Sequence, residues 1–253
     1  MRPIGVLRTP FVTRADCPRN GRQLDPSPPC EAVVFDEFAP GLNDLDGFSH
    51  LILLYWLDQI LPIRQQTRKG EVVFDTDEHV RHEAKLEDFE KLKPVFQKDG
   101  TVTAGNASGI NDGAAAVVLM ERSVAEKRGL KPMARLVSYG HAGVDPKVMG
   151  IGPVPATRIA LERAKMTVRD LDVIEANEAF AAQACAVTRG LDLDPAKVNP
   201  NGSGISLGHP VGATGVRLVL TALKELQRRR AKRALVTLCV GGGQGAALWL
   251  EKN

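Results

Sequence analysis

Asn199-Pro-Asn-Gly-Ser-Gly-Ile-Ser-Leu-Gly-His-Pro-Val-Gly-Ala-Thr-Gly215 is the centre of this sequence. This glycine–histidine stretch, residues 199–215, places five glycines around His209, and an apolar, helix-like run follows it from Val216 to Gln227. Glycine permits sharp bends and close approach of a ligand to the backbone, and histidine transfers protons near neutral pH. The stretch therefore predicts a ligand-binding turn beside an acid or base.

A second glycine cluster, Thr237-Leu-Cys-Val-Gly-Gly-Gly-Gln-Gly245, follows an apolar run that ends at Cys239. A histidine and a cysteine on glycine-rich turns suit thiol or thioester chemistry, because an imidazole can orient or deprotonate a thiol. Backbone N–H groups of residues 241–243 are able to face an oxyanion, as is the side chain of Asn177. Each of these residues ends or follows an apolar element, where ligands gather in α/β folds.

The composition is that of a globular protein with a sizeable core. The chain has 253 residues, of which 43% are apolar and 25% charged, and its net charge of +3 gives no reason to expect a nucleic acid. It has no bilayer-spanning apolar run and no signal peptide, and its four cysteines lack CxxC spacing. We therefore expect a cytoplasmic protein that binds no membrane, no nucleic acid and no metal.

Strands alternate with helices after residue 132, which predicts an α/β fold. We expect strands at 134–140, 173–176, 234–239 and 246–250, and helices at 157–164, 177–187 and 215–229. Asn177 is the expected helix cap, and Thr167 and Asp170 have capping-box spacing. Before this region we expect a buried strand at 114–120 and a short helix at 123–128. The basic run 228–233 is interpreted as a solvated helix end in preference to a nucleic-acid patch.

Five motifs, taken in order, resemble the biosynthetic thiolases, the acetyl-CoA acetyltransferases, from about Ile60 to the C-terminus. They are Ala104-Gly-Asn-Ala-Ser-Gly-Ile-Asn-Asp-Gly113, Gly143-Val-Asp-Pro-Lys-Val-Met-Gly150, Asn177-Glu-Ala-Phe180, Gly208-His-Pro-Val-Gly212 and Leu238-Cys-Val-Gly-Gly-Gly243. The resemblance implies a thiolase-type C-terminal domain over 132–253, with a mixed sheet covered by helices on both faces. Residues 59–131 would then be part of the thiolase N-terminal and coenzyme-binding loop region.

The resemblance also implies a reaction: Claisen condensation of two acetyl-CoA molecules, or the reverse thiolysis, with coenzyme A as the acyl carrier. Cys239 would be the acid/base, His209 would polarise the thioester oxygen and activate a nucleophilic cysteine, Asn177 would hold an oxyanion-hole water, and the N–H of Gly241 would complete a second oxyanion hole. The implied substrate contacts are Ser108, Ala104 and Ala107 at the pantetheine, Arg81 near the adenine end, and Met149 and Phe180 in the acyl pocket. The resemblance to thiolases also implies that this chain forms a homo-oligomer.

One part of the family pattern is missing from this sequence. The resemblance places the acylated cysteine in an N-terminal half that should precede Ile60, whereas Cys17 and Cys30 lie in proline-rich sequence. The site is thus expected to need two cysteines, of which this chain supplies one, and activity of the chain alone is left open. The same absence predicts an uncovered apolar face around residues 114–120.

Residues 1–57 resemble a different family. Ile4-Gly-Val-Leu-Arg-Thr-Pro-Phe11, Cys17-Pro-Arg-Asn-Gly-Arg-Gln23 and Gly47-Phe-Ser-His-Leu-Ile-Leu-Leu-Tyr-Trp56 are similar to the start of the tRNA N6-threonylcarbamoyladenosine methyltransferases. This implies a partial β-barrel-like segment over 1–58, with Arg19, Arg22 and His50 as S-adenosylmethionine or tRNA contacts; we favour solvated charges and a strand end for these three. The alternatives to a thiolase are therefore a fragment of an S-adenosylmethionine-dependent tRNA-modifying methyltransferase, or a non-catalytic fusion that only binds coenzyme A or a partner.

Overall fold

The computed structural model describes residues 32–35 and 59–252 of the chain. Its core is a six-stranded sheet in the order β4-β1-β5-β8-β7-β6, in which β6 and β7 are parallel and the other neighbours are antiparallel. The sheet is therefore mixed, as predicted. Its strands are β1 (Ala32–Phe35), β4 (Val118–Glu121), β5 (Ala134–Gly143), β6 (Val173–Ala176), β7 (Arg233–Val240) and β8 (Gln244–Glu251).

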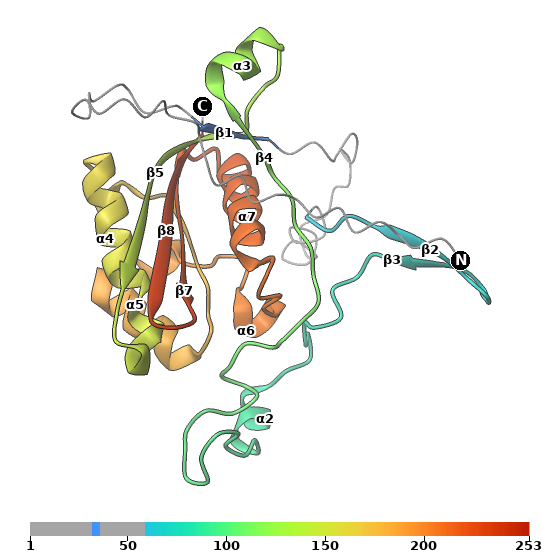
Figure 1. The fold of residues 1–253 in the computed structure, drawn as a ribbon. Helices are drawn as coiled ribbons and strands as arrows, with labels where there is room; N and C mark the ends of the chain where they lie inside the picture. The colour runs from blue at the N-terminus through green and yellow to red at the C-terminus, as the bar shows by residue number, and fades with distance from the viewer. Residues whose placement is uncertain (1–31, 36–58, 253) are drawn as a thin grey trace.

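Helices cover both faces of this sheet, which confirms the predicted α/β architecture. The helices α4 (Pro153–Ala164) and α5 (Ala181–Leu191) lie on one face and α7 (Thr214–Arg229) on the other (Figure 1). Side chains alternate between the faces along each strand. Ile174, Leu235 and Trp249 are buried on the α4 and α5 side, and their strand neighbours Val173, Val236 and Leu250 are buried on the α7 side.

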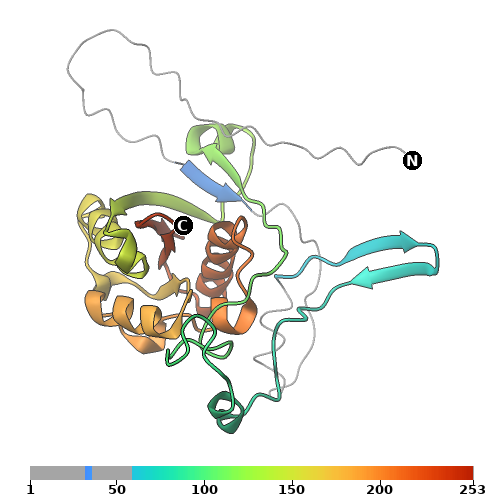
Figure 2. The ribbon, with the colours of Figure 1, turned by 60° about the horizontal axis from the view of Figure 1, so that its bottom comes forward.

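Shorter elements lie before the core and between its strands and helices. They are α2 (Leu86–Glu90), α3 (Arg122–Lys127), α6 (Gly204–Leu207) and the 3-10 turns η1 (Pro146–Ile151), η2 (Val168–Asp170) and η3 (Pro195–Lys197). A separate hairpin of β2 (Ile63–Thr67) and β3 (Gly70–Phe74) extends away from the sheet (Figure 2). Within the described residues, none of the helices has the length and apolar character needed to cross a membrane.

Several predicted boundaries are confirmed and others are wrong. The long helix before the basic run, the two strands joined by the glycine turn, and the Thr167–Asp170 capping box are all present. Asn177 is not a helix cap: α5 begins at Ala181 with Phe180 as its N-cap. The backbone is extended at this point because Ala107 and Phe180 form an antiparallel bridge and the Ser108 N–H donates to the Ala179 carbonyl at 3.0 Å.

Two other predictions are corrected by long-range contacts. The buried strand expected at 114–120 is β4, which covers only Val118–Glu121 and is largely exposed at the edge of the sheet. The basic run is not simply a solvated helix end, since Arg228 and Arg229 form ion pairs with the buried Glu225 of α7. Helix α4 begins at Pro153, earlier than predicted, and proline suits the first position of a helix.

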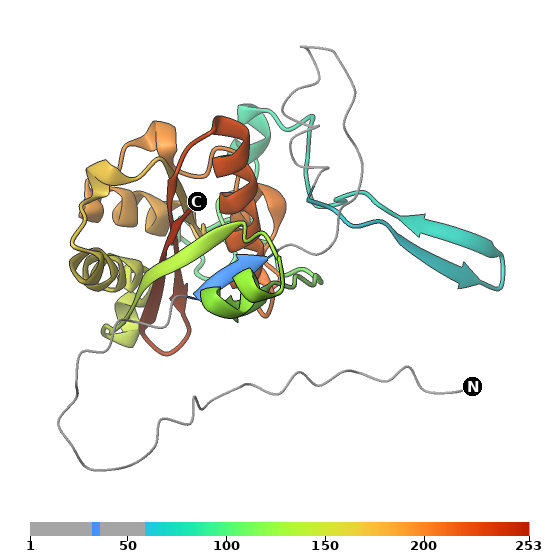
Figure 3. The same cartoon turned by 90° about the horizontal axis from the view of Figure 1, so that it is seen from above.

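Strand β1 comes from the segment that resembles the methyltransferases, and it pairs with β4 and β5 in the main sheet (Figure 3). The predicted contacts of Arg19, Arg22 and His50 lie outside the described residues, as does the rest of the barrel-like segment.

Candidate active site

The predicted site residues Asn177 and Cys239 lie at the carboxyl ends of two neighbouring strands, β6 and β7. Strands β6 and β7 run parallel with Ala176 opposite Thr237, and the Asn177 N–H donates to the Thr237 carbonyl at 3.0 Å. The carboxyl ends of parallel strands are where side chains from separate segments meet a ligand in α/β folds. The register thus brings together two residues that are far apart in the sequence.

The start of the glycine–histidine stretch is fastened to the end of β6. Asn199 accepts from the Ala176 N–H and donates to its carbonyl, both at 2.8 Å, and the Ser203 hydroxyl donates to the same carbonyl at 3.1 Å. A Cβ on Gly204 would lie 2.7 Å from the Glu178 carbonyl oxygen and 3.0 Å from Oδ1 of Asn177. Glycine is required at this position because the stretch packs directly against the backbone and side chain that follow β6.

Asn177 itself is buried without a hydrogen-bond partner. Its side chain is 2% exposed, and within the described residues neither Oδ1 nor Nδ2 makes a hydrogen bond. A buried amide that lacks both partners is rare in folded proteins and calls for an explanation, such as a bound water or ligand. Asn177 therefore has unused hydrogen-bonding capacity at the edge where the other site residues converge.

His209 lies between α6 and α7, and its ring is oriented by the first turn of α7. Nδ1 of His209 is 2.6 Å from Oγ1 of Thr214, and this hydroxyl donates to the Pro210 carbonyl at 3.0 Å. A hydroxyl has one proton to donate, so Nδ1–H must donate to Oγ1, and Nε2 then carries the free lone pair. Burial, with a contribution from the charge of Arg217, lowers the pKa of His209 and favours this neutral form.

The main chain of His209 is held by a residue that the sequence reasoning did not single out. The His209 N–H donates to Oδ1 of Asn111 at 3.1 Å, beside a parallel bridge between Ile110 and His209. The Nδ2 group of Asn111 is in turn 3.1 Å from Nδ1 of His79. Asn111 lies inside a quoted motif, but no local pattern indicated that it would reach the histidine turn.

Cys239 is the half-buried, next-to-last residue of β7 and pairs with Gly245 of β8. Burial raises the pKa of its thiol, so the resting group is a neutral S–H. In the glycine turn that follows, Gly242 and Gly243 have φ values of +87° and +88°, which side chains rarely adopt. A Cβ added to Gly241 would meet no atom within 4 Å, so packing does not explain glycine there.

The two predicted acyl-pocket residues, Met149 and Phe180, each lie next to a residue that contacts Gln183. Met149 lies in η1, where the Cα of the next residue, Gly150, packs against Gln183 of α5, and Oε1 of Gln183 accepts from the Ala179 N–H at 3.1 Å. The ring of Phe180, next in the chain, lies edge-on to Phe96 with the centroids 6.3 Å apart.

The predicted coenzyme contacts are only partly brought to this region. Ala107 and Ser108 are joined to Phe180 and Ala179 by the bridge and hydrogen bond described above. Ala104 and Arg81 are exposed. Ala104 precedes Gly105, whose Cα packs against Phe89 of α2. Ala104 therefore lies beside α2, and Arg81 lies in the segment that leads into this helix.

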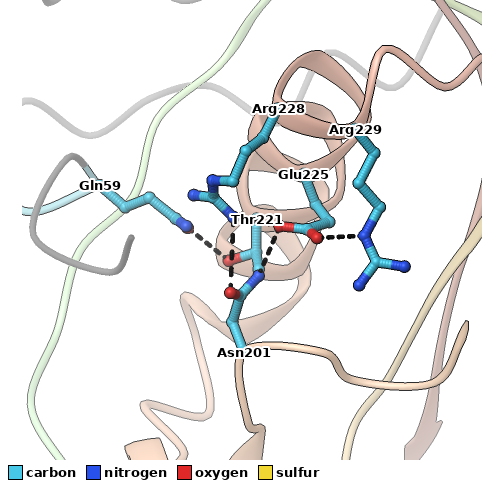
Figure 4. Close-up of polar contacts among 6 residues, drawn as sticks. All are labelled: Gln59, Asn201, Thr221, Glu225, Arg228 and Arg229. Carbon is cyan, nitrogen blue, oxygen red and sulfur yellow. Dashed lines mark hydrogen bonds and ion pairs between the residues drawn. The ribbon is translucent and has the colours of Figure 1, made fainter. Parts of the chain in front are cut away.

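A polar cluster on α7 ties this helix to the start of the glycine–histidine stretch (Figure 4). Asn201 donates to Oε2 of Glu225 at 3.0 Å, and Thr221 donates to Gln59 at 2.7 Å. Burial raises the pKa of Glu225, but the hydrogen bonds from Asn201 and Arg229 and the charges of Arg228 and Arg229 outweigh it and leave that pKa below its ordinary value. Glu225 is thus held as a carboxylate that anchors Asn201.

Two family models match nearly all of the described chain. The model for the thiolase N-terminal domain matches residues 55–123, and the model for the thiolase C-terminal domain matches residues 130–252. The chain belongs to the thiolase family.

Curated thiolases are similar to this chain over its last three quarters. Beta-ketothiolase BktB of Cupriavidus necator is 71% identical over 199 residues, which cover 78% of this chain and 50% of that protein. The acetyl-CoA acetyltransferase of Paracoccus denitrificans is 58% identical over 195 residues, covering 77% of this chain and 50% of that protein. The chain therefore spans about half the length of the curated relatives it matches.

Solved thiolase structures have the same fold. The Bacillus anthracis acetyl-CoA acetyltransferase aligns with a TM-score of 0.77 and 52% identity, over 81% of this chain and 54% of that one. Human mitochondrial 3-ketoacyl-CoA thiolase in complex with CoA aligns with a TM-score of 0.76 and 46% identity, over 81% and 51% of the two chains. Residues 1–54 lie outside both family matches.

Proposed function

We propose that this chain carries the acid/base half of a thiolase active site, for acyl transfer between molecules of acyl-CoA. The reaction is condensation of two acetyl-CoA molecules to acetoacetyl-CoA and coenzyme A, or its reverse. The observation that carries the proposal is Asn177, whose buried amide has no partner among the described residues although it lies at the strand edge shared with Cys239. An oxyanion site needs such a free, buried donor.

Each residue has a distinct role in this proposal. Cys239 rests as S–H and reacts through the fraction that is ionised: this thiolate removes a proton from C2 of acetyl-CoA, and the S–H so formed returns a proton later in the cycle. Asn177 holds a water that donates to the thioester oxygen as negative charge develops there. His209 presents Nε2, whose lone pair is free because Nδ1–H donates to Thr214, to the thiol that becomes acylated. The Nε2–H formed when it takes that thiol proton then donates to the thioester oxygen and so polarises the thioester whose methyl proton is removed. The N–H of Gly241 donates to the second oxyanion.

The carbanion at C2 then attacks an acyl group carried on a cysteine sulfur. A carbon–carbon bond forms, the carbon–sulfur bond to that cysteine breaks, and the released thiolate is reprotonated. The acylated cysteine is a second one, as the family resemblance implies; Cys185, the other described cysteine, is exposed on α5. Proton removal by Cys239 is therefore the step for which this chain has its own residue.

Other residues of the chain contact the substrate in this proposal. We propose that Ser108, with Ala104 and Ala107, contacts the pantetheine arm and that Arg81 lies near the adenine end. Met149 and Phe180 line the acyl pocket, and their chain neighbours Gly150 and Ala179 both contact Gln183. CoA bound to the human mitochondrial 3-ketoacyl-CoA thiolase supports coenzyme A as the ligand class.

The deciding experiment follows the methyl protons of acetyl-CoA in D2O with the full chain. Deuterium is expected to enter the methyl group, and Cys239→Ser is expected to lower this rate by about 100-fold or more, because the general base is removed. Cys185→Ser is the matched control, since its thiol is exposed and outside the site. Equal exchange in Cys239→Ser and the unmodified chain would overturn the proposal.

Two binding measurements separate the alternatives. Calorimetry is expected to detect binding of coenzyme A and no binding of S-adenosylmethionine. Coenzyme A binding without any methyl exchange would reduce the function to binding alone. Binding of S-adenosylmethionine would instead favour the methyltransferase interpretation.

A further inference from the structure

Asn111 and His79 form a chain of hydrogen bonds that ends on the backbone of His209. Oδ1 of Asn111 accepts from the His209 N–H at 3.1 Å, and Nδ2 of Asn111 is 3.1 Å from Nδ1 of His79. Nε2 of His79 is 3.4 Å from the carbonyl oxygen of Ile205, in α6. Asn111 and His79 are half-buried, and neither is among the catalytic or substrate-binding residues proposed above.

The direction of every hydrogen bond in this chain follows from its two ends. A backbone N–H only donates, so the Asn111 amide must present Oδ1 to His209 and Nδ2 to His79. A carbonyl only accepts, so Nε2 of His79 must carry a proton at the Ile205 end. Nδ1 of His79 is then the acceptor for Asn111, which requires a neutral ring in the Nε2–H form. Every donor in this series of hydrogen bonds therefore faces an acceptor.

The hydrogen bonds of Asn111 and His79 hold both ends of the short segment that carries His209. They reach Ile205 at one end and His209 at the other, and the intervening Gly208 has a φ of +85°. A Cβ on Gly208 would lie 2.4 Å from Oδ1 of Asn111, so the turn packs directly on this amide. His79 is positioned in turn by its own N–H, which donates to Oδ1 of Asp77 at 3.0 Å.

These contacts join two parts of the family pattern. His79 and Asn111 lie in residues 55–123, which match the thiolase N-terminal model, whereas Ile205 and His209 lie in the C-terminal match. His209 therefore takes its ring orientation from Thr214 in its own domain and its main-chain position from the other matched segment.

We propose that Asn111 and His79 are positioning residues for His209, holding its main chain so that Nε2 is presented to the reacting thiol from a fixed place. The role in catalysis rests on the proposed function, but the hydrogen-bond chain does not. Misplacement of a catalytic group by about 1 Å is enough to cost about 100-fold in rate. Neither residue contacts the reacting atoms in this proposal; both act through His209.

The test measures the histidines of the full chain directly. Nitrogen NMR of histidine-labelled protein is expected to show His79 as the Nε2–H tautomer and His209 as the Nδ1–H tautomer. Asn111→Ala is expected to weaken the tautomer preference at His79, which keeps only its contact with Ile205, and to speed amide hydrogen exchange at His209 by about tenfold or more, as an opened hydrogen bond does. Unchanged tautomers and unchanged exchange in a folded Asn111→Ala protein would overturn the proposal.

Conservative variants separate positioning from a general loss of structure. Asn111→Asp keeps the acceptor for the His209 N–H but faces Nδ1 of His79 with a second acceptor in place of the donor, so protection at His209 is expected to persist while Nδ1 of His79 gains a proton. His79→Gln retains an acceptor and a donor and is expected to preserve more His209 protection than His79→Leu. His141→Leu is the control, because His141 is exposed and its ring contact is with Tyr139. Equal protection in all four proteins would overturn the role of His79.

The two proposals fail in different ways. If the unmodified chain does not exchange the acetyl-CoA methyl protons but the NMR results hold, the proposed function fails and the hydrogen-bond chain stands. If the chain is active, Asn111→Ala is expected to lower the maximal exchange rate by roughly 10- to 100-fold with little change in the half-saturating acetyl-CoA concentration. The opposite split, a weaker affinity at an unchanged maximal rate, would assign Asn111 to substrate binding and overturn the positioning role.

Discussion

Nδ1 of His209 lies 2.6 Å from Oγ1 of Thr214, and that hydroxyl donates its proton to the Pro210 carbonyl. The ring therefore has Nδ1 protonated and Nε2 free, which is the tautomer that a base acting through Nε2 requires. Thr214 is the first residue of α7, so the long helix fixes the proton position of the histidine through its own first turn.

Thr214→Val is expected to lower methyl-proton exchange in acetyl-CoA by about 10- to 100-fold, because the His209 ring loses the acceptor that selects its tautomer. Thr214→Ser keeps the hydroxyl and is the matched control. Rates are measured by NMR in D2O, with histidine nitrogen spectra of both variants. If Thr214→Val and Thr214→Ser behave alike, the hydroxyl does not select the tautomer.

The stability of the chain is expected to depend on pH through His209. Burial, followed by the charge of Arg217, lowers its pKa below the ordinary 6.5, so the unfolded chain binds a proton more readily than the folded one. This contribution to stability is present above pH 6.5 and is lost as the pH falls towards the lower, folded-state pKa. Urea unfolding at a series of pH values from 7.5 to 5 measures this slope. His209→Gln should have a shallower slope, and an unchanged slope would contradict the assignment.

Asn177→Ala and Asn199→Ala are expected to separate a functional amide from a structural one. Asn177 has no hydrogen-bond partner among the described residues, so its removal should change the free energy of unfolding by less than about 1 kcal/mol while abolishing methyl exchange. Asn199→Ala leaves the Ala176 N–H without its side-chain partner and the Ala176 carbonyl with only the Ser203 hydroxyl, and should cost about 2–3 kcal/mol. Equal destabilisation of the two variants in denaturant titrations would mean that Asn177 is structural.

Gly204→Ala and Gly241→Ala provide a second matched pair. A Cβ at Gly204 meets the Glu178 carbonyl oxygen at 2.7 Å, and this substitution is expected to cost about 1–3 kcal/mol of stability. Gly241 has open space at the same position, so Gly241→Ala is expected to change stability by less than about 0.5 kcal/mol. Its methyl-exchange rate should nevertheless fall if the space belongs to the substrate. Full activity in Gly241→Ala would exclude a close contact there.

Much of the C-terminal fold was predictable because its signals are local. Continuous apolar runs identified β7 and β8, the glycine cluster identified the turn between them, and the apolar, helix-like sequence of 215–229 identified α7. The cap of α5 was not predictable in this way. Asn177 has the chemistry of a cap, but the bridge between Ala107 and Phe180 holds Phe180 in an extended conformation, and the helix starts only at Ala181.

The residue types of the site were likewise readable from short motifs, since a thiol or imidazole among glycines indicates its chemistry whatever surrounds it. The partners that tune those groups were not readable, because they come from distant segments. Oδ1 of Asn111 reaches the His209 N–H across 98 residues of sequence, and His79 reaches Ile205 across 126. Chemistry was thus set by local sequence, whereas tautomer, burial and position were set by tertiary contacts that close long loops and have no local periodicity.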